Sequence, residues 1–173
     1  MNIHPFIVHF PIALLTLYSI FEFFPLERWY PRVVWQDIKA IFVCFGGAGL
    51  LAALVTGQLA ESSLIARASG NILHLHKLFA GASTAIFGLV ALAYFIQWVF
   101  NKHTAFSRPL KVNFPLIGAY SDFMLKRWVV VLFALAGFVT LSITGALGVM
   151  IIYGPNGDFI TKFVYQLFKP LLQ

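Results

Sequence analysis

Residues 129–153 read VVVLFALAGFVTLSITGALGVMIIY, and no Lys, Arg, Asp or Glu interrupts them. At about 1.5 Å per residue, a helix of this length crosses the roughly 30 Å of hydrocarbon in a bilayer. A helix also satisfies its own backbone hydrogen bonds, which lipid cannot do. The stretch therefore predicts a transmembrane helix over about residues 127–153.

Three further stretches are equally free of acidic and basic side chains. They occupy residues 5–21, 41–59 and 78–100. With their flanks they predict helices over about residues 5–24, 39–59 and 73–100. Only 10% of all residues are charged and the mean hydropathy is +0.86, whereas about a quarter of the residues of a soluble protein are charged. The sequence predicts an all-α protein, an integral membrane four-helix bundle forming a single transmembrane domain over residues 1–173, and it excludes a soluble domain.

Basic residues favour one side of the predicted bundle. Eight Lys and Arg residues lie in or beside the first and third loops, and these are Arg28, Arg32, Lys39, Lys102, Arg108, Lys111, Lys126 and Arg127. All four tryptophans lie on the same side, where interfacial anchors are found. The positive-inside rule makes this side cytoplasmic and places both termini outside. The formal net charge of +6 is explained in this way, and nucleic acid is not an expected partner.

The connections outside these helices carry two further signals. Residues 154–157, Gly-Pro-Asn-Gly, predict a turn. Apolar residues then recur at intervals of four, at Phe159, Phe163, Leu167 and Leu171. They predict a short C-terminal amphipathic helix, which either lies on the outer membrane surface or packs on the bundle. The long, proline-broken third loop, residues 101–126, is expected to dock on a partner subunit or on lipid headgroups.

A weak internal repeat relates the two halves of the chain. Thr56-Gly57 lies near the outer end of the second predicted helix, and Thr144-Gly145 lies at the same level of the fourth. The helices that precede them begin with His4 and His9, and with His74 and His76, respectively. The pattern indicates two parallel hairpins related by an axis along the membrane normal, although three matched residues also arise by chance.

The four histidines just named gather at the predicted outer end of the bundle. Ionisable residues that border membrane helices point to function, and neutral imidazole is a common ligand of haem iron. His4 and His9 project about 140° apart, and His74 and His76 about 200° apart, so only some of them face the core. We expect His9 and His76 to be the axial ligands of a b-type haem, with His4 or His74 as substitutes or as a second pair. The alternative is that they are interfacial histidines bonded to carbonyls or headgroups.

Other residues complete the predicted haem site. Thr56-Gly57 and Thr144-Gly145 would clear space for a flat macrocycle, and Arg67 and Lys77 would pair with its propionates. The alternatives are close helix packing at the glycines and snorkelling of the two basic side chains. At the inner interface, Glu22 is a candidate proton or quinone contact, or an ordinary carboxylate at headgroup level.

Four segments resemble a bacterial membrane family catalogued as domain of unknown function 2231. They are residues 4–15, HPFIVHFPIALL; 54–57, LVTG; 75–80, LHKLFA; and 144–154, TGALGVMIIYG. The resemblance covers nearly the whole chain. It implies a four-helix domain of the bacterial inner membrane, with both termini periplasmic on the orientation above. His4, His9 and His76 match the family's histidines, whereas His74 and Val149 depart from its pattern. Some relatives are fused to modules like cytochrome c, which implies redox work by association.

Together these features predict an electron-transfer or accessory subunit more than a stand-alone enzyme. The protein would bind haem b near the periplasmic face, with quinone as a further candidate cofactor. Its expected partners are the lipid bilayer, other membrane or periplasmic redox subunits, and further copies of itself. A non-catalytic structural subunit of a larger membrane complex is the alternative, and a metal or small-molecule transporter is a third hypothesis.

Overall fold

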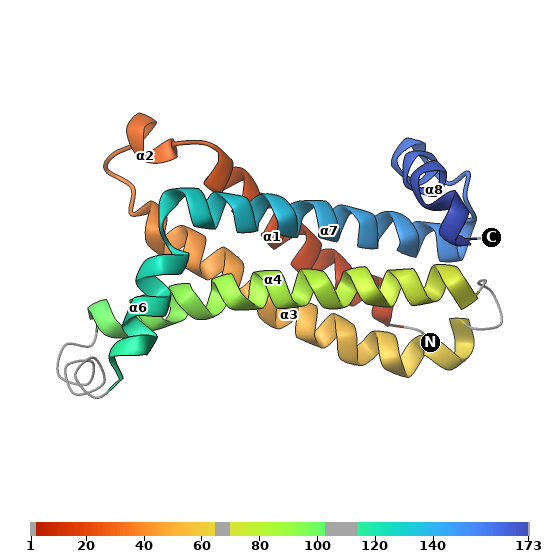
Figure 1. The fold of residues 1–173 in the computed structure, drawn as a ribbon, viewed down its shortest axis with the longest axis horizontal. Helices are drawn as coiled ribbons and strands as arrows, with labels where there is room; N and C mark the ends of the chain where they lie inside the picture. The colour runs from red at the N-terminus through yellow and green to blue at the C-terminus, as the bar shows by residue number, and fades with distance from the viewer. Residues whose placement is uncertain (1–2, 65–69, 103–113, 173) are drawn as a thin grey trace.

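The computed structural model describes residues 3–64, 70–102 and 114–172. Four long helices run the length of the molecule, and no strand occurs in these ranges (Figure 1). They are α1 (His4–Phe23), α3 (Trp35–Leu64), α4 (Gly70–Lys102) and α7 (Arg127–Tyr153). All four are long and apolar enough to cross a membrane. The prediction of an all-α, four-helix membrane bundle is confirmed.

Two of these helices are longer than the hydropathy pattern predicts. α3 begins at Trp35 rather than near residue 39 and continues to Leu64, and α4 extends from Gly70 to Lys102. Hydropathy falls where a chain leaves the hydrocarbon, but polar residues such as Asp37 in the first turn of α3 are compatible with continued helix. The helices therefore project beyond the apolar stretches that reveal them.

The bundle consists of two helical hairpins. α1 packs chiefly on α3, and α4 packs chiefly on α7. Small residues let the backbones approach, because a Cβ added at Gly46 would lie 2.6 Å from the Leu15 side chain, and one at Gly137 would lie 2.7 Å from Phe87. Leu15 and Phe87 are fully buried. Close helix packing is thus what these two glycines provide.

Three shorter helices lie at the ends of the bundle. α2 (Leu26–Trp29) and α6 (Pro115–Met124) are at one end. α6 occupies part of the long loop that was expected to be irregular, because Pro115 stands in its first turn, where proline favours rather than breaks a helix. The Ser121 hydroxyl donates to the Ala93 carbonyl at 2.9 Å, and the Tyr120 hydroxyl donates to Leu89 at 2.6 Å. This part of the loop therefore docks on α4 of its own bundle.

The predicted amphipathic helix is α8 (Phe159–Leu172), which crosses the other end of the bundle (Figure 1). Its inner face packs through buried Val164 and through Phe168, whose ring meets Phe79 edge-on at 5.4 Å. The residues of its outer row are exposed, and they are Phe159, Phe163, Leu167 and Leu171. α8 therefore packs on the bundle and keeps an apolar row for the membrane interface, which combines the two predicted roles.

The start of α8 is fixed by Asp158. Its carboxylate accepts hydrogen bonds from the Thr161 backbone N–H at 2.8 Å and from the Thr161 hydroxyl at 2.9 Å. This is an N-terminal cap of the kind that satisfies otherwise unpaired helix donors. These hydrogen bonds from Thr161 lower the pKa of Asp158 below its ordinary value.

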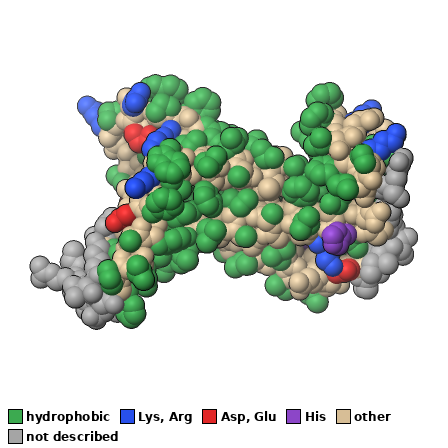
Figure 2. Space-filling model, in the orientation of Figure 1, with side chains coloured by type: hydrophobic (Ala, Val, Ile, Leu, Met, Phe, Trp, Pro, Cys, Tyr) green, Lys and Arg blue, Asp and Glu red, His purple; other side chains and the backbone are tan. Residues whose placement is uncertain are grey.

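Charge is confined to the two ends of the face shown in Figure 2, with a broad apolar belt between them. The four candidate spans and this belt match a lipid environment. We call the end where α1 and α4 begin the histidine end. The opposite end, where Trp29, Trp35, Trp98 and Trp128 lie, is the tryptophan end. The termini lie together at the histidine end (Figure 1); which end faces the cytoplasm stays a prediction.

Candidate functional site

His4 and His76 occupy equivalent places in the two hairpins. Each stands near the start of its helix, α1 or α4, and each is partly buried. His4 Nδ1 lies 3.0 Å from the Thr56 hydroxyl of α3, and His76 Nδ1 lies 3.0 Å from the Thr144 carbonyl of α7. Each ring is therefore tied, through the same nitrogen, to the threonine of the facing helix in its own hairpin.

The hydrogen-bond partners fix the tautomer of both rings in their neutral form. The Thr144 carbonyl can only accept, so His76 Nδ1 must be the donor. The Thr56 hydroxyl donates to the Ala52 carbonyl at 2.9 Å, which leaves its oxygen to accept from His4 Nδ1. In neutral imidazole the other nitrogen, Nε2, then carries the lone pair. This is the arrangement in which a protein orients a histidine to ligate a metal through Nε2.

The two imidazoles come from different hairpins and stand at the same end of the bundle. A Cβ added at Gly57 would lie 3.1 Å from His4 Cε1, and one at Gly148 would lie 3.4 Å from His76 Cε1. Gly57 and Gly148 therefore give room to the imidazole rings, rather than to a macrocycle directly. Gly145 has nothing within 4 Å of an added Cβ, so it contacts neither ring.

This matched geometry agrees with the internal repeat in the sequence. The hairpin α1–α3 carries a histidine bonded to Thr56, and the hairpin α4–α7 carries a histidine bonded to Thr144. In both cases a glycine of the same facing helix lies against the ring. The match is partial, because Thr56 bonds its ring through the hydroxyl and Thr144 through the backbone carbonyl. The glycine beside the second ring is Gly148 rather than Gly145 of the repeat.

His9, the predicted partner of His76, lies elsewhere. Its ring is exposed, and its Nδ1 is bonded to the Pro5 carbonyl of its own helix at 2.5 Å. It lines an apolar groove of about 710 Å³ between α1 and α3, with Phe10 and Phe45 among the other lining residues. The structure therefore anchors His4 and His76 on their facing helices and leaves His9 in the groove. His74 is exposed as well.

The predicted propionate partners are not assembled around the histidines. Lys77 is half exposed, and its ammonium contacts both carboxylate oxygens of Glu61 at 2.9 Å. A bound propionate would therefore compete with Glu61. Arg67 lies outside the described residues.

The metal-ligating side chains that the protein offers limit which metal sites it could form. Among residues 3–64, 70–102 and 114–172, no three His, Cys, Asp or Glu side chains converge in a way that could hold a metal ion. A closed tetrahedral site needs four such ligands, whereas haem iron takes its four equatorial ligands from the porphyrin and needs only axial ones from the protein. Two imidazoles are enough for the axial positions of haem, and they do not make a zinc site.

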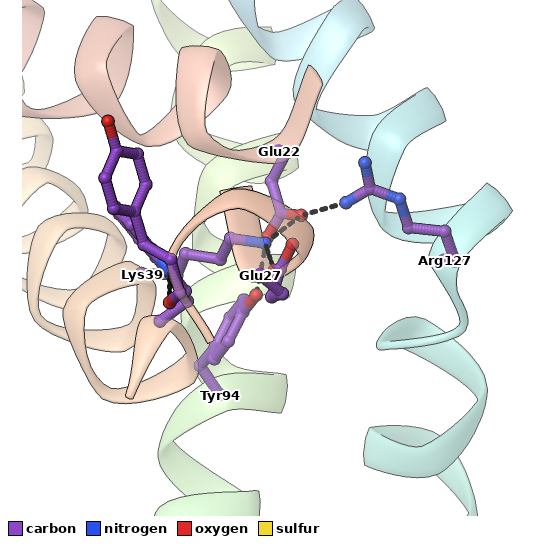
Figure 3. A network of polar contacts seen from close by, with 7 residues as sticks. Glu22, Glu27, Lys39, Tyr94 and Arg127 are labelled. Atoms are coloured by element: carbon purple, nitrogen blue, oxygen red, sulfur yellow. Dashed lines mark hydrogen bonds and ion pairs between the residues drawn. The ribbon is translucent and has the colours of Figure 1, made fainter. Parts of the chain in front are cut away.

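The tryptophan end holds a buried ionic cluster around Glu22, whose side chain is only 1% exposed. Glu22 accepts a hydrogen bond from the Tyr94 hydroxyl at 2.5 Å, and its other oxygen lies 3.1 Å from the Lys39 ammonium and 3.4 Å from the Arg127 guanidinium. Lys39 also contacts Glu27 at 2.6 Å. Figure 3 shows these side chains converging; they come from α1, α2, α3, α4 and the start of α7.

The sequence predicted Glu22 to be a proton or quinone contact, or an ordinary carboxylate at headgroup level, and it did not predict this cluster. The available signal was the pair of opposite charges, Glu22 and Lys39, each at the edge of an otherwise apolar stretch. Because burying one charge alone is expensive, such residues usually pair. Burial raises the pKa of Glu27, but the hydrogen bonds it accepts from Lys39 and from its own backbone, together with the charges of Lys39 and Arg127, outweigh burial, so the pKa is lowered from its ordinary value.

No family model, curated protein or solved structure matches the chain. The resemblance to domain of unknown function 2231 therefore stays a prediction, and function has to be argued from the site itself.

Proposed function

We propose that this protein is a membrane electron-transfer subunit that binds b-type haem at its histidine end, with His4 and His76 as axial ligands. The observation that supports the proposal is the matched anchoring of the two rings. Each donates from Nδ1 to a threonine of the facing helix, at 3.0 Å in both cases. In the neutral form each ring would then carry its lone pair on Nε2.

Each part of the site would have a definite task. Haem supplies one-electron chemistry when bound. His4 and His76 would hold the iron, and Thr56 and Thr144 would keep the rings oriented and more basic through the Nδ1 hydrogen bonds. The surrounding apolar helices would exclude water and so adjust the reduction potential. The room that Gly57 leaves for His4 would keep that ring close to α3.

The proposed axial pair, His4 and His76, differs from the predicted pair, His9 and His76, because His9 faces the groove between α1 and α3. Both His4 and His9 lie on α1, but His4 is bonded to Thr56 of the facing helix, whereas His9 is bonded to the Pro5 carbonyl of its own helix.

The same proposal includes the side of the membrane on which the haem lies and the partners that exchange electrons with it. The basic loops favour a cytoplasmic tryptophan end, so the haem would lie near the periplasmic face of a bacterial inner membrane. Its redox partners would then be other membrane subunits or periplasmic carriers. Reporter fusions at the C-terminus test the sidedness, and activity confined to a cytoplasmic reporter would contradict it.

The haem proposal is tested by purifying the protein in detergent from cells supplied with a haem precursor. The expected result is a coloured protein with the sharp reduced-minus-oxidised bands of a six-coordinate b-type haem. His76→Ala should lose these bands, whereas His74→Ala, a matched control two residues away with an exposed ring, should keep them. A colourless wild-type protein that still folds would contradict the proposal and favour the structural-subunit alternative.

A further inference from the structure

A cavity of about 570 Å³ opens beside the ionic cluster at the tryptophan end. Its size lies within the range of small-molecule sites. Trp35 and Tyr94 supply aromatic surface, and Val33, Val34 and Val130 supply aliphatic surface. The walls are thus partly apolar, and they lie at the depth where the tryptophans place the membrane interface.

The charges that line the cavity balance each other. Glu22 and Glu27 carry two negative charges, and Lys39 and Arg127 carry two positive ones. An ion entering the cavity would be attracted by two of these charges and repelled by the other two. A neutral ligand is therefore favoured over an anion or a cation.

The hydrogen-bonding groups in the cavity include both a donor and an acceptor that remain accessible. The Arg127 side chain is 50% exposed and the Glu27 side chain is 49% exposed. Arg127 can donate to a carbonyl oxygen, and Glu27 can accept from a hydroxyl. A ligand whose oxygens are carbonyls when it is oxidised and hydroxyls when it is reduced would find a hydrogen-bond partner in both redox states.

A further buried group lies behind this cluster. Tyr18 is fully buried, its ring meets that of Tyr94 at 6.0 Å, and its hydroxyl makes no hydrogen bond of normal geometry within the described residues. Buried polar groups are rarely left unsatisfied. Tyr18 does not line the cavity itself, so it extends the polar interior behind the Glu22–Tyr94 pair rather than the ligand-facing wall.

We infer that this cavity binds the headgroup of a lipid-phase quinone and its quinol. A flat neutral ring fits against Trp35 and Tyr94, its oxygens meet Arg127 or Glu27, and an apolar tail leaves toward the bilayer. The inference deepens the proposed function, on which it rests for the choice of a redox-active ring. It concerns binding only, because Glu22 and His4 are eighteen residues apart on α1, about 27 Å at about 1.5 Å per residue.

Trp35 provides a direct probe, since it is the only one of the four tryptophans that lines the cavity. Titration of the detergent-solubilised protein with a short-chain ubiquinone should quench tryptophan fluorescence saturably. Trp35→Phe should remove most of that quenching. Arg127→Gln should raise the apparent Kd roughly tenfold, as expected for a lost hydrogen bond to a charged group. The adjacent Lys126→Gln, which does not line the cavity, should leave the Kd unchanged.

Several outcomes would overturn the inference. They are quenching that does not saturate, quenching that persists in Trp35→Phe, or equal Kd values for Arg127→Gln and Lys126→Gln in proteins with unaltered thermal unfolding. Displacement of the ubiquinone by phosphatidylethanolamine at equal mole fraction would assign the cavity to a lipid headgroup instead. Glu27→Gln is a second variant, expected to weaken binding of the quinol form more than that of the quinone.

The same titration in His76→Ala separates this inference from the haem proposal. Quenching should persist there even when haem is lost, because the two sites lie at opposite ends of α1. A protein that binds haem but does not respond to ubiquinone would overturn this inference alone.

Discussion

Replacing Lys39 by methionine should destabilise the protein strongly, because it leaves a buried carboxylate without its main partner. The Lys39 ammonium lies 3.1 Å from Glu22, and the two side chains are 5% and 1% exposed. Removing one member of a buried ion pair costs about 3–5 kcal/mol. Arg127, 3.4 Å from the same carboxylate but half exposed, offsets part of this. We therefore expect a loss near the lower limit, about 3 kcal/mol.

Lys77→Met is the matched control, since Lys77 makes an ion pair of similar length with Glu61, but the two side chains are 52% and 33% exposed. Exposed pairs contribute about 0–1 kcal/mol, so the control should change little. The double variant Glu22→Gln/Lys39→Met should recover most of the loss, because neutral replacement of a whole buried pair is often tolerated.

The assay is reversible unfolding in mixed micelles, followed by circular dichroism as the denaturing detergent fraction rises. The free energies of unfolding of the wild type, Glu22→Gln, Lys39→Met and the double variant close a cycle for Glu22 and Lys39. If Lys39→Met costs no more than Lys77→Met, or if the double variant is as unstable as the sum of its parts, the cluster does not stabilise the fold in the way argued.

Two further predictions concern packing and pH. Gly137→Ala should lower the free energy of unfolding by about 1–3 kcal/mol, because the new Cβ would lie 2.7 Å from Phe87; Gly88→Ala, with nothing within 4 Å, should be neutral or stabilising by up to about 1 kcal/mol. Equal effects in the same unfolding assay would refute the packing argument. The pKa of Asp158 is lowered by its hydrogen bonds from Thr161, so its cap stabilises α8 at neutral pH and is lost as the pH falls below about 4. The protection of the α8 amides, relative to their intrinsic exchange rates at each pH, should fall on that acidification in the wild type, and Asp158→Ala should show low protection already at neutral pH.

The membrane helices could be predicted from sequence because a single physical constraint, an uncharged run long enough to cross hydrocarbon, identifies each of them. Their ends could not, since α3 and α4 continue beyond the hydrocarbon, where hydropathy no longer reports on helix. α6 was missed for a related reason. Pro115 looks like a helix breaker in a loop, but in the first turn it is compatible with helix.

The choice among the histidines was the part of the site that sequence could not settle. Helical geometry shows that His4 and His9 point in different directions. It does not show which of them faces the other hairpin, because α1 is apolar on every side and gives no amphipathic signal. The repeated Thr56 and Thr144 were the better indicator of which histidines face the neighbouring helix, since each threonine is bonded to a histidine of the preceding long helix.

The spectrum of haem bound to His4→Ala, recorded beside that of His9→Ala, tests the central claim most directly. The two histidines belong to the same helix, so loss of an imidazole is matched between the variants. If His4 and His76 are the axial ligands, His4→Ala should lose the six-coordinate reduced-minus-oxidised bands and His9→Ala should keep them. Bands that survive in His4→Ala and vanish in His9→Ala would contradict the account and would identify His9 as the axial ligand.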